Sequence, residues 1–108
     1  MGLFDFLKAD KPNNRLDINS GLAECRNIQG AKLVDVRTRG EFMERSIPGS
    51  INVPLQDIQS ISTYVSKLDT PLYLYCRTGA RSSTAASLLI NMGYTSVHNI
   101  GGIVDWRP

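Results

Sequence analysis

Short apolar runs alternate with amphipathic stretches along residues 15–108. Residues 72–76 (Leu-Tyr-Leu-Tyr-Cys) form the run most typical of a strand. Residues 80–92 form the pattern most typical of a helix, and Gly93 follows as the expected C-cap. Weaker patterns predict strands at 31–36, 51–53 and 97–100, and helices at 20–28 and 55–68. The inward faces of the three helices are expected to comprise Leu22, Cys25 and Ile28; Leu55, Ile58, Ile61, Val65 and Leu68; and Ala85, Ala86, Leu89, Ile90 and Met92.

Strands separated by helical segments at this spacing favour parallel pairing, with crossover helices on both faces of the sheet. The predicted fold class is therefore α/β, with one layer of short, mostly parallel strands between helices. Residues 1–14 differ, because the apolar patch Leu3-Phe4 and Phe6-Leu7 precedes the breaker-rich Lys11-Pro12-Asn13-Asn14. We expect an N-terminal tail at 1–14 and one domain at 15–108. The patch fits either a short helical turn packed on the domain or a docking peptide.

Composition and charge narrow the classes of function. The chain has 108 residues, of which 42% are apolar and 20% charged, as in an ordinary globular protein. A net charge of +2 is too small to indicate a nucleic-acid or membrane partner, and the basic residues are scattered, so we expect no nucleic-acid partner. No stretch approaches the roughly 18 apolar residues of a membrane span, and no secretory signal is apparent. The expected location is therefore a reducing cytoplasm, where Cys25 and Cys76 remain unbridged.

The segment after the predicted strand 72–76 carries the candidate chemistry. It reads Cys76-Arg77-Thr78-Gly79-Ala80-Arg81-Ser82 and leads directly into the predicted helix. Ligands of open α/β sheets bind beyond the carboxyl ends of the strands. Gly79 permits a tight turn with inward N–H groups, the helix adds its positive end, and two arginines add charge. Such surroundings lower the pKa of a thiol, so Cys76 is the candidate nucleophile.

When Cys76 is considered by itself, a purely structural role is the alternative, because buried cysteines at strand ends are common. The combination of strand end, mid-loop glycine, two arginines and a small-residue helix start favours function. A thiol pKa near 8.5 leaves only about 3% thiolate at pH 7, whereas a pKa near 6.5 makes the thiolate the major form. That change corresponds to about 2.7 kcal/mol, which we expect a helix terminus and two arginines to supply.

These residues resemble the rhodanese family in its single-domain form, over roughly Asp17 to Trp106. Four segments are similar to family motifs and occur in order: Leu33-Val34-Asp35-Val36-Arg37 with Glu41-Phe42, residues 47–55, the loop from Cys76 to Ser82, and Gly101-Gly102 with Trp106. The resemblance implies that Cys76 accepts a sulfane sulfur in a cradle lined by Arg77, Thr78, Gly79, Ala80, Arg81 and Ser82. It also implies a structural pair between Arg37 and Glu41. Ser46 departs from the family's usual histidine, which bears on donor preference.

The resemblance predicts a sulfurtransferase that uses thiosulfate, a polysulfide or a persulfide as donor and cyanide, a thiol or a protein cysteine as acceptor. No cofactor is expected, and Cys25, Cys76 and His98 lack metal-ligand spacing. One alternative is a non-catalytic binding module that uses the same loop. The other is a phosphatase or arsenate reductase, whose loops carry five residues between cysteine and arginine; here Cys76 and Arg81 enclose four.

Two further residues invite functional hypotheses. Cys25 falls on the apolar face of its predicted helix and is expected in the core, with a resolving role toward Cys76 as the alternative. His98 lies in a predicted strand and is expected to be structural rather than catalytic.

Overall fold

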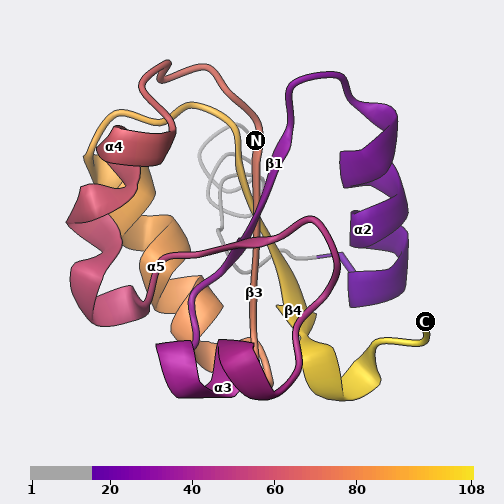
Figure 1. Cartoon of the computed structure of the whole chain (residues 1–108). Helices are drawn as coiled ribbons and strands as arrows, with labels where there is room; N and C mark the ends of the chain where they lie inside the picture. The colour runs from indigo at the N-terminus through magenta and orange to yellow at the C-terminus, as the bar shows by residue number, and fades with distance from the viewer. Residues whose placement is uncertain (1–15) are drawn as a thin grey trace, which may run out of the picture.

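A four-stranded parallel sheet lies at the centre of the computed structural model, which describes residues 16–108. The strand order is β2-β1-β3-β4. Figure 1 shows the sheet with its helices. The strands are β1 (Lys32–Asp35), β2 (Ile51–Asn52), β3 (Leu72–Cys76) and β4 (Val97–Gly102). The predicted α/β class with parallel strands is confirmed. The predicted tail 1–14, with its apolar patch, lies outside the described residues.

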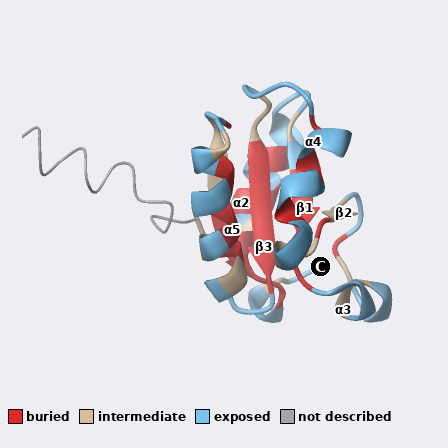
Figure 2. Ribbon diagram, turned by 90° about the vertical axis from the view of Figure 1, so that its left-hand side faces the viewer, coloured by how far each residue is buried: buried red, intermediate tan, exposed pale blue. Residues whose placement is uncertain are grey.

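Helices cover both faces of this sheet, as the crossover connections require. Helix α2 (Ile18–Asn27) packs on one face, while α5 (Ala80–Asn91), the 3-10 helix η1 (Leu55–Ser60) and α4 (Ile61–Tyr64) pack on the other. The residues of β3 are all buried (Figure 2). Successive side chains of the strand point to opposite faces of the sheet. Leu72, Leu74 and Cys76 join the core beneath α5, and Tyr73 and Tyr75 join the core beneath α2.

The helix boundaries follow from local capping. Asp17 caps α2 by accepting the backbone N–H groups of Asn19 and Ser20. Thr38 and Glu41 form a reciprocal capping box at the start of α3 (Arg39–Glu44). Helix α5 ends at Asn91 with Met92 as its C-cap, and Gly93, the predicted C-cap, follows one residue later with a positive φ of 107°. Within residues 16–108, no helix combines the length and apolar character needed to cross a bilayer.

The prediction of one helix over residues 55–68 was wrong. Asp57 breaks the helical geometry with φ −112° and ψ 20°, and α4 ends at Tyr64. Two short pieces are enough to bury Ile58, Ile61 and Val65 against the sheet. Leu68, expected to point inward, is 48% exposed, and its carbonyl accepts the backbone N–H of Thr95 instead of continuing a helix.

Two other side chains expected in the core are exposed. Ile28 is 38% exposed because α2 has ended before it and its backbone is extended. Ile90 is 43% exposed because it lies about 100° around α5 from the buried Leu89, beyond the stripe that faces the sheet.

Candidate active site

The sulfur of Cys76 lies inside the turn that joins β3 to α5. Gly79 is the N-cap of α5 and has a left-handed φ of 110°, with no side chain to cap the helix. The sulfur takes that place: it accepts the N–H of Gly79 at 3.0 Å, the N–H of Ser82 at 3.4 Å and the Ser82 hydroxyl at 3.5 Å. The predicted inward-facing amides are therefore present around the thiol.

These donors change the acidity of the thiol. Burial by itself raises the pKa of Cys76, but hydrogen bonds from the Ser82 hydroxyl and from the backbone of Ser82, Gly79 and Thr78 outweigh it. The pKa of the Cys76 thiol is consequently lowered from its ordinary value. The direction of the shift and the inward-facing N–H donors agree with the expectation from the sequence, whereas the two arginines are not among the main causes and the Ser82 hydroxyl is the further donor.

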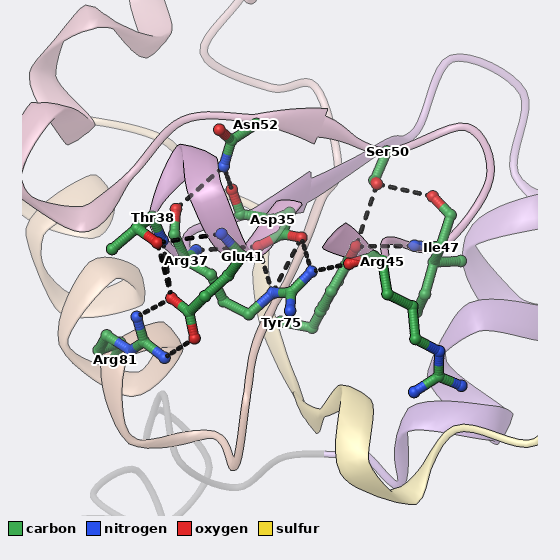
Figure 3. Close-up of polar contacts among 10 residues, drawn as sticks. All are labelled: Asp35, Arg37, Thr38, Glu41, Arg45, Ile47, Ser50, Asn52, Tyr75 and Arg81. Carbon is green, nitrogen blue, oxygen red and sulfur yellow. Dashed lines mark hydrogen bonds and ion pairs between the residues drawn. The ribbon is translucent and has the colours of Figure 1, made fainter. Parts of the chain in front are cut away.

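Arg81 is engaged by a carboxylate next to the loop. Its two terminal nitrogens donate to the Glu41 carboxylate at 2.7 and 3.1 Å (Figure 3). Glu41 belongs to α3, so the pair ties that helix to the start of α5. Arg77, in contrast, is exposed. The pair lowers the pKa of Glu41 to about 2, chiefly through the hydrogen bonds from Arg81.

The predicted pair between Arg37 and Glu41 was wrong. Arg37 instead forms a buried pair with Asp35, with Nη2 to Oδ2 at 2.7 Å and Nε to Oδ1 at 3.0 Å. The chain turns directly after β1, which brings the two side chains together two residues apart and leaves Glu41 free for Arg81 (Figure 3). Asp35, fully buried, therefore has a partner for its charge.

Substituting Glu41 by glutamine is expected to lower the free energy of unfolding by about 1 kcal/mol at pH 7, since the pair is partly solvent-screened. The pKa of Glu41 falls from 4.5 to about 2 on folding. The contribution is thus full above about pH 5 and disappears as pH falls toward 2. Urea unfolding of both proteins at pH 7 and pH 3 checks this. If wild-type protein and Glu41→Gln differed in free energy of unfolding by the same amount at pH 7 and at pH 3, the prediction would be contradicted.

Tyr75 and Asn52 hold the segment between α3 and β2 against the sheet. The Tyr75 hydroxyl accepts the N–H of Ile47 and lies 3.1 Å from the Ser50 hydroxyl. The Asn52 amide donates to the carbonyls of Asp35 and Arg37 at 3.0 Å (Figure 3). Burial raises the pKa of Tyr75 to about 12, so this phenol stays protonated. Ser46 directly precedes Ile47 in the chain, and the side-chain donors to the Cys76 sulfur within residues 16–108 do not include it.

Strand β4 approaches the thiol loop at Gly102. The register slips between Leu74 and Cys76, so Gly102 lies opposite Cys76. A Cβ atom at Gly102 would lie 2.1 Å from the Arg77 carbonyl oxygen, a separation that a side chain cannot tolerate. The Gly101-Gly102 motif therefore leaves room for the loop backbone itself.

Cys25 and His98 lie apart from the thiol loop. Both cysteines are free, and Cys25 belongs to the core beneath α2, on the opposite face of the sheet from Cys76. This placement confirms Cys25 as a core residue and disfavours a resolving role. His98 stacks on Tyr73 with ring centroids 4.6 Å apart, and its Nε2 lies 3.1 Å from the Ser96 hydroxyl. Among residues 16–108, no cluster of metal-ligating side chains is present.

Sequence reasoning misassigned one residue of the site and overlooked another. Glu41 was assigned to the wrong arginine, and Asn99 was not considered at all. Asn99 is a buried amide on β4 that contacts both Gly79 and Ser82. The available signal was an asparagine inside an apolar strand, directly before the Ile100-Gly101-Gly102 motif.

A parallel sheet with a cysteine-containing loop at the C-terminal end of a central strand is the arrangement of a known class of protein. The family model described as the rhodanese-like domain matches residues 20–108. The chain therefore belongs to the rhodanese family, as its sequence motifs suggested.

Individual relatives agree with this assignment. The thiosulfate sulfurtransferase PspE of Escherichia coli (strain K12) is 36% identical over 73 residues, which cover 67% of this chain and 70% of that protein. The thiosulfate sulfurtransferase GlpE of Pseudomonas savastanoi pv. phaseolicola is 38% identical over 88 residues, covering 79% and 80%. The solved structure of a rhodanese with anions from E. coli has a TM-score of 0.67 at 34% identity, covering 70% of this chain and 91% of that one.

Proposed function

We propose that this protein is a sulfurtransferase that carries a sulfane sulfur as a persulfide on Cys76. The observation that supports this most strongly is the convergence of the Gly79 N–H, the Ser82 N–H and the Ser82 hydroxyl on one sulfur atom. Such donors stabilise an anionic nucleophile, and they would equally stabilise the anionic end of a bound persulfide. Relatives that share the family are thiosulfate sulfurtransferases.

In the first half-reaction, the Cys76 thiolate attacks the outer sulfur of a donor such as thiosulfate. A new sulfur–sulfur bond forms, the donor's own sulfur–sulfur bond breaks, and sulfite leaves with its electron pair. The loop lowers the pKa of the Cys76 thiol, so the proposed step uses no separate general base. Residues 77–82 form the proposed cradle, with the helix N-terminus oriented toward the donor anion.

In the second half-reaction, a thiophilic acceptor, such as a low-molecular thiolate or a protein cysteine, attacks the outer sulfur of the persulfide. The bond to Cys76 breaks, its electron pair returns to the Cys76 sulfur, and the thiolate is restored. Each half-reaction is a transfer of neutral sulfur between nucleophiles, so the enzyme itself is neither oxidised nor reduced over the cycle. Two half-reactions that share a covalent intermediate give ping-pong kinetics.

The tightness of the loop supports sulfur transfer over phosphate chemistry. Only four residues separate Cys76 from Arg81, and Cys76 is 1% exposed. Two of the five N–H donors of the Arg81 guanidinium are directed at Glu41, so a phosphate would have to compete with this carboxylate for the arginine. p-Nitrophenyl phosphate turnover at a rate comparable to sulfur transfer would favour the phosphatase alternative instead.

Incubation with thiosulfate followed by intact-protein mass spectrometry tests the proposal. We expect a mass gain of one sulfur atom that maps to the peptide containing residue 76 and is reversed by cyanide. The Cys25→Ala variant is the control and should show the same gain, since Cys25 lies on the other face of the sheet. A gain that maps to Cys25, or no gain on either cysteine while the protein stays folded, would favour the non-catalytic binding module.

A further inference from the structure

One buried side chain joins β4 to the loop around the proposed nucleophile. Asn99 is 1% exposed and makes three hydrogen bonds that span the site. Its Nδ2 donates to the Gly79 carbonyl at 3.2 Å, and its Oδ1 accepts the Gly101 N–H at 3.0 Å and the Ser82 hydroxyl at 2.7 Å. The Asn99 side-chain amide is thus hydrogen-bonded to the N-cap residue of α5, to the irregular part of β4 and to Ser82, which itself donates a hydrogen bond to the Cys76 sulfur.

The hydrogens around Ser82 can be assigned one by one. The Gly79 carbonyl oxygen also lies 3.1 Å from the Ser82 hydroxyl oxygen, but it already accepts the Ser83 N–H at 3.1 Å and the Asn99 Nδ2, which fills both of its lone pairs. The Ser82 hydroxyl carries one hydrogen, and two acceptors remain for it: the Asn99 Oδ1 and the Cys76 sulfur. These two acceptors lie 2.7 and 3.5 Å from the Ser82 oxygen, so the same hydrogen can serve either of them by rotation about one bond.

We propose that Asn99 is a positioning residue that makes the Ser82 hydroxyl a two-position donor, bonded to Asn99 when Cys76 is a thiol and to the sulfur when Cys76 is ionised. This inference rests on the proposed function, in which the Cys76 sulfur is charged as a thiolate and carries no formal charge once it is the inner sulfur of the persulfide. In the thiol form, the S–H can donate to the Ser82 oxygen while the hydroxyl donates to Asn99. On ionisation the thiol proton passes to solvent, and the hydroxyl rotates onto the sulfur.

Neither position leaves a buried polar group without a partner. When the hydroxyl turns away from Asn99, the Oδ1 atom keeps the Gly101 N–H. The full penalty for an unsatisfied buried acceptor is therefore avoided in both states. The two backbone N–H donors are fixed by the turn, and the nearby arginines are either paired, Arg81 with Glu41 and Arg37 with Asp35, or exposed to solvent, as Arg77 is. The hydroxyl is consequently the donor that can respond to the charge on the sulfur.

A double-mutant cycle on the alkylation rate of Cys76 tests this inference. All proteins carry Cys25→Ala, and the rate of reaction with iodoacetamide is followed against pH. At pH values below the midpoint of the pH profile, we expect Ser82→Ala to slow alkylation by at least about threefold, because the thiolate loses a hydrogen-bond donor. Asn99→Leu should accelerate it by about threefold, because the acceptor competing for the Ser82 hydrogen is gone. In the Ser82→Ala background, Asn99→Leu should change the rate by less than about 1.5-fold.

If Asn99 had only a structural role, Asn99→Leu would change the alkylation rate of Cys76 in the opposite direction. A loosened loop would withdraw the amide donors from the sulfur and slow alkylation whether or not the Ser82 hydroxyl is present. Slower alkylation in Asn99→Leu, or an equal change in both backgrounds, would therefore overturn the inference. Ser83→Ala is the matched control, since Ser83 enters the network through its backbone N–H, and it should leave the profile unchanged.

A second variant covers the case in which Asn99→Leu does not fold, as judged by urea unfolding. Asn99→Asp keeps the acceptor and strengthens it, so alkylation should slow more in the Ser82 protein than in the Ser82→Ala protein; equal slowing would contradict the inference. The mass gain with thiosulfate is measured on the same wild-type sample. Absence of the mass gain would overturn the proposed function. A mass gain together with additive effects of the Ser82 and Asn99 substitutions on the alkylation rate would overturn the inference about Asn99 alone.

Discussion

Replacing Cys76 with serine is expected to lower sulfur transfer from thiosulfate to cyanide by at least about a thousandfold while the fold is retained. The serine oxygen fits the same donors, but a hydroxyl is far less acidic than a thiol and is not ionised near neutral pH. The donors around the sulfur, from Gly79 and Ser82, cannot compensate for that difference. Steady-state turnover and the sulfur mass gain should both be lost.

Retention of the fold is checked by urea unfolding, where Cys76→Ser should change the free energy by less than about 2 kcal/mol. Cys25→Ser is the matched control, because Cys25 is also buried but lies beneath α2. That variant should keep wild-type turnover. Substantial sulfur transfer by folded Cys76→Ser protein would refute Cys76 as the sulfur carrier.

Alanine at Gly102 is expected to reduce turnover by about a hundredfold and stability by about 1–3 kcal/mol. Gly102 has ordinary extended dihedral angles, with φ −128° and ψ 143°, so backbone strain is not the reason. The added Cβ would lie 2.1 Å from the Arg77 carbonyl oxygen and 2.5 Å from the Thr78 Cα. The loop between Cys76 and Gly79 would have to shift, which misaligns the amides that bind the sulfur.

Gly40→Ala is the matched control for this substitution. Gly40 lies in α3, and the nearest atom to its added Cβ is the Thr38 Oγ1 at 4.0 Å. Alanine there should leave turnover unchanged and raise stability slightly, because alanine favours a helix more than glycine does. Both quantities are measured by the turnover assay and by urea unfolding. Wild-type turnover in Gly102→Ala would show that the contact with the loop is not needed for activity.

Local sequence patterns determined the core of the fold and singled out Cys76 as the candidate nucleophile. The five-residue strand that ends at Cys76 and the helix that begins at Ala80 agree with the boundaries predicted from apolar periodicity. The loop residues are contiguous, so a glycine that turns the chain and a helix that follows at once predict inward-facing amides around the thiol. Residues near in sequence interact by short-range geometry, which a pattern can reveal.

The partners that complete the site were decided by the tertiary structure. Glu41 meets Arg81 across 40 positions of sequence, and Asn99 meets Ser82 across 17. These pairs depend on where α3 lies and on the register shift between β3 and β4. The broken helix at 55–68 has the same origin, since burial of three side chains against the sheet outweighed the helical periodicity. Contacts between distant segments follow from packing and register, and apolar periodicity carries information on neither.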